Sequence, residues 1–275
     1  MRKVNFLSIL AISTCISSFV ACTTEVLPMT DESHFTTVVA EAMGSTLSDQ
    51  AITTVDEMIS KFNAISIAKV SGMQKVNASG LEKYVSLTSE PGVFPKEMLV
   101  NFGDEGYTDE NKNTFRGKIY IIVTDKAAKV KQYKFSEFSL NKNNIEGEKM
   151  VEVVDKGVMK ISAKESVKMA NGSESNRYSE RIRTRIDDNK TDTIYTDDSY
   201  SFTGYTEGIT SKGVKYVLKI DKPIISKGGF RYFVSGSIST STEKGTQWIN
   251  FGEGEEDNIA ISTINETSKK LELKW

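Results

Sequence analysis

The 275-residue chain contains little cysteine, histidine and proline. Its two cysteines, Cys15 and Cys22, both lie near the N-terminus, so the rest of the chain has to fold without disulfides. The one histidine, His34, has no second histidine or thiolate near it, which disfavours a zinc site and a Ser-His-Asp triad. The four prolines interrupt few strands. A net charge of −2 supplies no basic excess for nucleic-acid phosphates, so we expect no nucleic-acid partner.

A short apolar run at the N-terminus has the features of an export signal. Arg2 and Lys3 are positive, and the uncharged stretch from Phe6 to Val20 follows them. A membrane span needs ~20 apolar residues, whereas the h-region of a secretory signal is shorter. We therefore predict a signal peptide over residues 1–21. No later apolar stretch reaches membrane length.

The end of this run resembles the lipobox of bacterial lipoproteins. Phe19-Val20-Ala21-Cys22 places a small residue before a cysteine, although Phe19 stands where leucine is usual. The resemblance implies that Cys22 carries lipid, which makes the membrane a partner through this anchor. Ordinary secretory cleavage after Ala21 is the alternative. Each buried methylene contributes ~0.8 kcal/mol, so the two or three acyl chains of a lipoprotein cysteine give stable attachment. Thr23, in place of aspartate, implies sorting to the outer membrane.

Residues 22–34 are polar and are expected to form a tether. Residues 35–70 are expected to form one or two short helices, because apolar residues recur there every three to four positions. These residues are Phe35, Val38, Val39 and Ala42 in the first segment, and Ile52, Val55, Ile59 and Phe62 in the second. Ser48 or Asp49 is the predicted N-cap of the second helix.

The remainder, over residues 90–275, has the pattern of an antiparallel β body built from successive hairpins. Short β-branched and aromatic segments follow one another between turn signals at intervals of ~8–12 residues. The expected strands are 118–123, 131–140, 150–154, 158–161, 194–195, 200–205, 214–220, 232–239, 248–251 and 271–273. The expected turns are Asn143-Asn144, Lys156-Gly157, Asn171-Gly172, Lys212-Gly213, Gly228-Gly229 and Lys244-Gly245.

Two motifs recur within this body. Asn101-Phe102-Gly103 and Asn250-Phe251-Gly252 are each followed by acidic residues. An apolar-x-Gly pattern occurs at Gly117, Gly147, Gly204 and Gly236, where a glycine inside a strand indicates a bulge, a bend or close backbone approach. The repeats predict either two related sheet units or one long sheet with pseudo-symmetric ends.

The order of these motifs resembles a family of uncharacterised lipoproteins of Bacteroides-type bacteria. The resemblance covers roughly residues 98–275 and rests on Asn101-Phe102-Gly103, Phe115 to Val123, Phe138 to Gly147, Asp198 to Gly204, Lys222-Pro223, Phe230-Arg231, Val234 to Gly236 and Asn250-Phe251-Gly252. Relatives often carry cysteines near Tyr107 and Phe230, so any disulfide of theirs is absent here. The family implies no activity and no functional residue.

Three acidic clusters raise the question of calcium, which prefers six to eight oxygen ligands. They are Asp104, Glu105, Asp109 and Glu110; Glu253, Glu255, Glu256 and Asp257; and Asp187, Asp188, Asp192, Asp197 and Asp198. None has EF-hand spacing, and solvated turns that protect strand edges are the favoured interpretation. We therefore expect no metal.

Two further sets of residues are candidates for ligand binding. Alternation places Arg181, Arg183 and Arg185 on one strand face, with Arg177 upstream. They suit an anionic polysaccharide or a lipid head group, but cross-strand pairing with carboxylates is the favoured interpretation. Five aromatics offer stacking surfaces for sugars, or else core and cross-strand pairs. They are Tyr195, Tyr200, Tyr205, Trp248 and Trp275.

No nucleophile elbow, phosphate-binding loop or distinct carboxylate pair stands out in the sequence. We expect a non-enzymatic lipoprotein of the outer membrane or cell surface, structural or ligand-binding, with no cofactor. A carbohydrate-binding component of an uptake or adhesion complex is the alternative, with a glycan or an envelope protein as its partner. A glycosidase remains the third hypothesis.

Overall fold

A computed structural model describes residues 45–70, 83–90, 93–109, 112–127, 129–170, 172–187, 198–228, 230 and 232–273. All of them belong to one compact unit, residues 31–275. The predicted signal peptide, Cys22, the tether and the helical segment 35–42 lie outside the described residues. Within the described part, no helix is long and apolar enough to cross a membrane.

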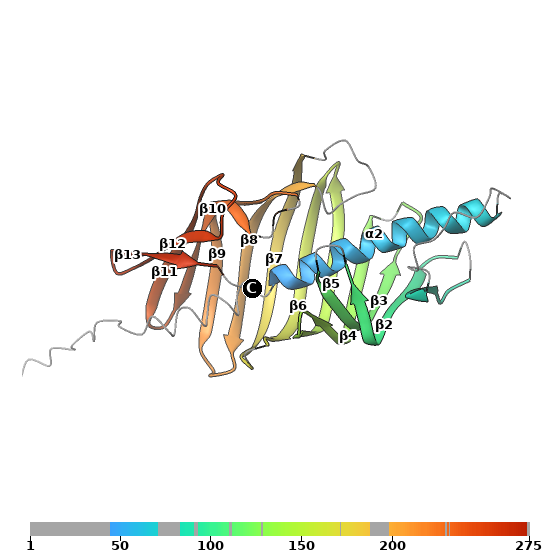
Figure 1. Ribbon diagram of the computed structural model, residues 1–275, viewed down its shortest axis with the longest axis horizontal. Coiled ribbons are helices and arrows are strands. Elements are labelled where there is room, and N and C mark those ends of the chain that lie inside the picture. Colours follow the sequence, from blue (N-terminus) through green and yellow to red (C-terminus); the bar gives the residue numbers. More distant parts are fainter. Residues whose placement is uncertain are drawn as a thin grey trace, which may run out of the picture. The chain divides into compact units, whose positions relative to one another are not determined.

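In the described part of the chain, thirteen strands form one antiparallel sheet, in which every strand pairs with its neighbours in the chain (Figure 1). This confirms the mainly β class and the succession of hairpins, in one long sheet. The strands are β1 Val85–Leu87, β2 Lys96–Thr108, β3 Thr114–Val123, β4 Val130–Leu140, β5 Asn143–Asp155, β6 Val158–Lys168, β7 Glu174–Asp187, β8 Ser199–Thr210, β9 Lys215–Ser226, β10 Phe233–Thr242, β11 Gly245–Glu253, β12 Ile259–Ile264 and β13 Thr267–Glu272.

The structure corrects two of the sequence-based expectations along the sheet. The turn expected at Asn143-Asn144 lies instead at Asn141 and Lys142, which reverse the chain between β4 and β5 with positive φ angles. Asn143 is already the first residue of β5. Four strands, β1, β2, β7 and β12, have no counterpart among the expected segments, and β1 also precedes the expected start of the β body at residue 90. The expected strand 194–195 lies outside the described residues.

The helix α2, Ser45–Val70, lies on one face of the sheet, which we call the inner face; the opposite face is the outer face (Figure 1). The predicted second helix is confirmed, and it begins earlier than expected. Ser48 and Asp49 are therefore wrong as N-caps. Both lie inside the helix, are buried, and bind Lys149 of β5.

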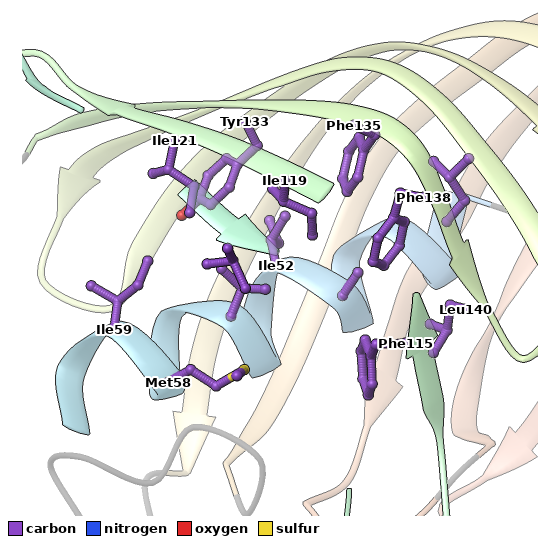
Figure 2. Close-up of a cluster of buried hydrophobic side chains, with 14 of the residues drawn as sticks. Ile52, Met58, Ile59, Phe115, Ile119, Ile121, Tyr133, Phe135, Phe138 and Leu140 are labelled. Atoms are coloured by element: carbon purple, nitrogen blue, oxygen red, sulfur yellow. The ribbon is translucent and has the colours of Figure 1, made fainter. Parts of the chain in front are cut away.

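The apolar side of α2 packs against the inner face of β1 to β6. Ile52 and Ile59 of the helix point toward Ile121 and Tyr133 of the sheet (Figure 2). Burial of each large aliphatic side chain contributes ~1.5–3 kcal/mol, so this cluster fixes the helix on the sheet. Its buried members are Leu47, Ala51, Ile52, Val55, Met58, Ile59, Val85, Met98, Val100, Phe102, Phe115, Ile119, Ile121, Val123, Tyr133, Phe135, Phe138, Leu140, Ile145, Val151, Ile161 and Val167.

A second hydrophobic cluster lies on β8 to β13, and β7 separates it from the first. The inward residues of β7 are polar, namely Ser175, Arg177, Ser179, Arg181 and Arg183, and all five are buried. The buried members of the second cluster are Tyr200, Phe202, Tyr216, Leu218, Ile224, Ile238, Ile249, Phe251, Ala260 and Leu273. The single sheet therefore has two apolar halves with a polar boundary between them.

The repeated sequence motifs have equivalent structures in the two halves. The Asn101 Oδ1 atom accepts a hydrogen bond from Gly103 N at 3.0 Å, and Asn250 Oδ1 accepts one from Gly252 N at 2.9 Å. Phe102 is buried in the first cluster and Phe251 in the second.

The four apolar-x-Gly glycines lie at or opposite shifts in strand register, and they approach neighbouring backbone closely, which were two of the predicted alternatives. All have positive φ, and each approaches the backbone of a neighbouring strand. A Cβ on Gly204 would lie 2.2 Å from the carbonyl oxygen of Glu180, and one on Gly117 would lie 2.0 Å from that of Glu137. Only glycine permits this geometry.

Candidate functional site

A cluster of buried charges joins α2 to β5, β6 and β7 on the inner face. Lys149 Nζ lies 2.6 Å from Asp49 Oδ1, 2.5 Å from Ser48 Oγ and 3.5 Å from Glu165 Oε1. Arg181 pairs with Asp49 at 2.7 Å, and Arg177 with Glu165 at 3.1 Å. Two carboxylates thus share three cations.

This cluster is closed to solvent, because the side chains of Lys149 and Glu165 are 0% exposed. Burial opposes ionisation of Asp49, but Arg181 and then Lys149 outweigh it, so the pKa of the Asp49 carboxyl is lowered. Breaking a buried pair on one side costs ~3–5 kcal/mol, since the remaining charge stays uncompensated. The cluster therefore sets the position of α2 and offers no surface to a substrate.

A second polar contact holds the next turns of the helix. Tyr133 Oη donates to Asp56 Oδ1 at 2.7 Å, and Lys131 pairs with Asp56 at 3.0 Å. Burial, and next the negative Asp56, raises the pKa of Tyr133 well above its ordinary value. These contacts, like those of Lys149, join residues far apart in the sequence.

The arginine stripe lies on one face of β7, as predicted, but that face is the inner one. Arg177 pairs across strands with Glu165, as favoured, and Arg185 lies 3.5 Å from Asp198. Arg181 instead pairs with the helix. Because Arg177, Arg181 and Arg183 are buried, the interpretation as a surface for anionic ligands is wrong for them.

Arg183 has a different environment from the other three arginines. Its guanidinium donates to Thr53 Oγ1 at 3.2 Å and lies 4.7 Å from the ring centroid of Tyr200. Tyr200 is thus buried under Arg183 and donates to Asp198 at 2.8 Å, so it is not a stacking surface for sugars.

A groove of about 980 Å³ lies over strands β4 to β9, and most of the side chains that line it belong to the outer face. It holds three lysines and three exposed glutamates, together with amide, hydroxyl and aromatic groups. The lining residues with side chains on the outer face are Lys134, Glu146, Glu148, Lys164, Ser166, Asn176, Tyr178, Glu207, Ile209, Lys215 and Val217. We call this set the outer groove.

Tyr178 is the aromatic ring of the outer groove. Its hydroxyl donates to Glu180, and this hydrogen bond raises the pKa of Tyr178 to about 12. The ring centroid of Tyr205 lies 6.4 Å away, with 60° between the ring planes. Tyr178 therefore keeps its proton and its orientation at neutral pH, and Tyr205 supports it as a cross-strand partner.

The remaining predicted aromatics and acidic clusters have the following places. Trp248 is 48% exposed on the outer face of β11, and Tyr195 and Trp275 lie outside the described residues.

Among the described residues, no three acidic, histidine or cysteine side chains converge on one point. Asp109 accepts from Asn113 N at 2.7 Å, and Glu255 accepts from Glu253 N at 2.9 Å, so both stabilise turns. Glu110, Asp188, Asp192 and Asp197 lie outside the described part.

Comparison of the chain with protein-family models, with curated proteins and with solved structures found no match. The resemblance to Bacteroides-type lipoproteins therefore stays a prediction. The outer groove is the candidate site that sequence reasoning missed. It takes one or two residues from each of six strands, and no local motif marks them.

Proposed function

We propose that the protein is a lipid-anchored, non-enzymatic binding protein of the bacterial outer membrane, held by Cys22. The observation that supports a binding role is the outer groove, which lies on the sheet face away from α2. The described cluster that combines lysine, arginine and carboxylates at short distances is closed to solvent, so its role is structural.

The anchor is tested by metabolic labelling with an alkyne fatty acid in a bacterial host that processes lipoproteins. We expect the wild-type chain to incorporate label and to fractionate with membranes, because each acyl chain adds many buried methylenes. The Cys22→Ala variant is expected to lose both properties. A matched Cys15→Ala variant should keep them, since Cys15 lies inside the signal peptide. Label on the Cys22→Ala variant would contradict the proposal.

The side of the membrane is tested by treating intact cells with a protease and following the protein by blot, with a periplasmic control protein. Loss of the protein while the control survives would place the body outside the cell. Survival until the outer membrane is permeabilised would place it in the periplasm, where crosslinking would identify envelope partners.

A carbohydrate-binding component of an uptake or adhesion complex is the second candidate. Tyr178 and Tyr205 favour it, because both lie on the outer face beside carboxylates and an amide. The two rings are not coplanar, so they do not form one flat platform.

A further inference from the structure

One row of outer-face residues crosses six strands through the outer groove. Directly opposed partners lead from Tyr120 of β3 through β4, β5 and β6 to Tyr178 of β7, and on to Glu207 of β8. The members are Tyr120, Lys134, Glu148, Lys164, Tyr178 and Glu207. The row therefore reads aromatic, positive, negative, positive, aromatic, negative.

The charged side chains of this row have no ion-pair partner among the described residues. Lys134 and Lys164 both lie directly opposite Glu148, the arrangement in which cross-strand ion pairs usually form. Yet none of the four charged residues of the row makes an ion pair with any described residue. Their donors and acceptors face solvent and are free for a ligand.

The sign alternation excludes strongly charged polymers as ligands. Two lysines and two glutamates give the row no net charge. A polyanion is therefore attracted by the lysine at one position and repelled by the glutamate at the next. The same holds for a polycation. An extended peptide needs an open sheet edge for backbone pairing, and this row lies inside the sheet.

We infer that the row binds an uncharged polysaccharide lying across the strands. Sugar hydroxyls both donate and accept hydrogen bonds, so they suit alternating ammonium and carboxylate groups. The apolar C–H faces of sugar rings pack on tyrosine rings, which bury apolar area. Tyr120 and Tyr178 are four strands apart, or ~19 Å at ~4.8 Å per strand, so the ligand is a chain.

Tyr178 is the principal contact in this arrangement. Its hydrogen bond to Glu180 and its contact with Tyr205 hold the ring before the ligand arrives. A preformed ring costs less side-chain entropy on binding. This inference rests on the proposed binding role of the outer groove and names its ligand class.

The test is affinity electrophoresis of the full-length protein in non-ionic detergent. The gels contain dextran, mannan, galactan or xyloglucan, with heparin and polylysine as charged probes. We expect retardation by at least one uncharged polysaccharide. Tyr178→Ala should weaken that affinity about tenfold, the cost of one central aromatic contact. Lys164→Ala, at an exposed site, should weaken it less without disturbing the fold.

The matched control is Trp248→Ala, which removes an exposed aromatic from the outer face of β11, outside the row. Its affinity should equal that of the wild type. The inference is overturned if no uncharged polysaccharide retards the protein, or if Tyr178→Ala binds as tightly as Trp248→Ala. Retardation by heparin or polylysine alone, abolished by Tyr178→Ala, would overturn the ligand class and leave the outer groove as a binding site.

Discussion

Replacing Lys149 by methionine tests whether the buried charge cluster holds α2 on the sheet. The substitution keeps an unbranched side chain, one atom shorter, and removes its charge. It takes a cation away from Asp49 at 2.6 Å and from Glu165 at 3.5 Å, in a place where the side chain of Lys149 is 0% exposed. Neither carboxylate can rotate into solvent. The negative charge of both is therefore compensated less fully than in the wild type.

The expected loss of unfolding free energy is about 3 kcal/mol. Removing one partner of a buried ion pair costs ~3–5 kcal/mol. The lower end applies because Asp49 keeps Arg181 and Glu165 keeps Arg177. The measurement is urea unfolding of wild type and variant with linear extrapolation.

The control is Lys134→Met on the neighbouring strand β4, where the same substitution removes an exposed lysine that has no ion pair with a described residue. Its effect should stay within about 0.5 kcal/mol. Double-mutant cycles with Asp49→Asn and Glu165→Gln should give Lys149 the larger coupling with Asp49, the nearer carboxylate. If Lys149→Met costs less than about 1 kcal/mol, or stabilises the protein, the cluster does not hold the helix and the reasoning fails.

Three further predictions follow from single contacts. The pKa of Asp49 is depressed in the folded state. Its ionised carboxylate therefore stabilises the folded protein above the ordinary pKa of 3.8, and this stabilisation is lost as pH falls through the folded pKa. Between pH 6 and 3, the urea midpoint should fall more steeply for wild type than for Asp49→Asn. Gly204→Ala should destabilise more than Gly213→Ala in the same assay, because both have positive φ but only Gly204 meets backbone there; equal losses would refute the close approach. Glu180→Gln should bring the titration of Tyr178 down from about 12, seen as phenolate absorbance appearing at lower pH, and an unchanged curve would contradict their hydrogen bond.

Most of the strands with an apolar inner face could be predicted from sequence. In β4, Tyr133 and Phe135 alternate with polar residues, and this period identified the strand and its buried side. The strand β7 was not predicted, because its inward residues are serines and arginines and its sequence therefore has the pattern of a polar segment. The arginine alternation gave the correct face of β7, yet the partner of Arg181 lies on a helix more than a hundred residues earlier.

The outer groove could not be predicted from the sequence, for a related reason. Lys134, Glu148 and Lys164 each look like an ordinary solvated strand residue in their own segment. Only the strand register places them side by side, and that register depends on glycine bends and bulges whose exact count of residues the sequence does not reveal. The N-cap prediction failed similarly, because Ser48 and Asp49 satisfy Lys149 across the core.

The consecutive strand order has a consequence for how such chains differ in length. Each strand pairs only with the strands adjacent in the chain, so gain or loss of one hairpin changes the strand pairing only at that point of the sheet. The Asn-Phe-Gly motif in β2 and again in β11 fits growth by duplication of such units. The stretch from β4 to β7 is different, because α2 binds side chains there at fixed positions. We therefore expect insertions and deletions of whole hairpins among relatives to fall between β8 and β13.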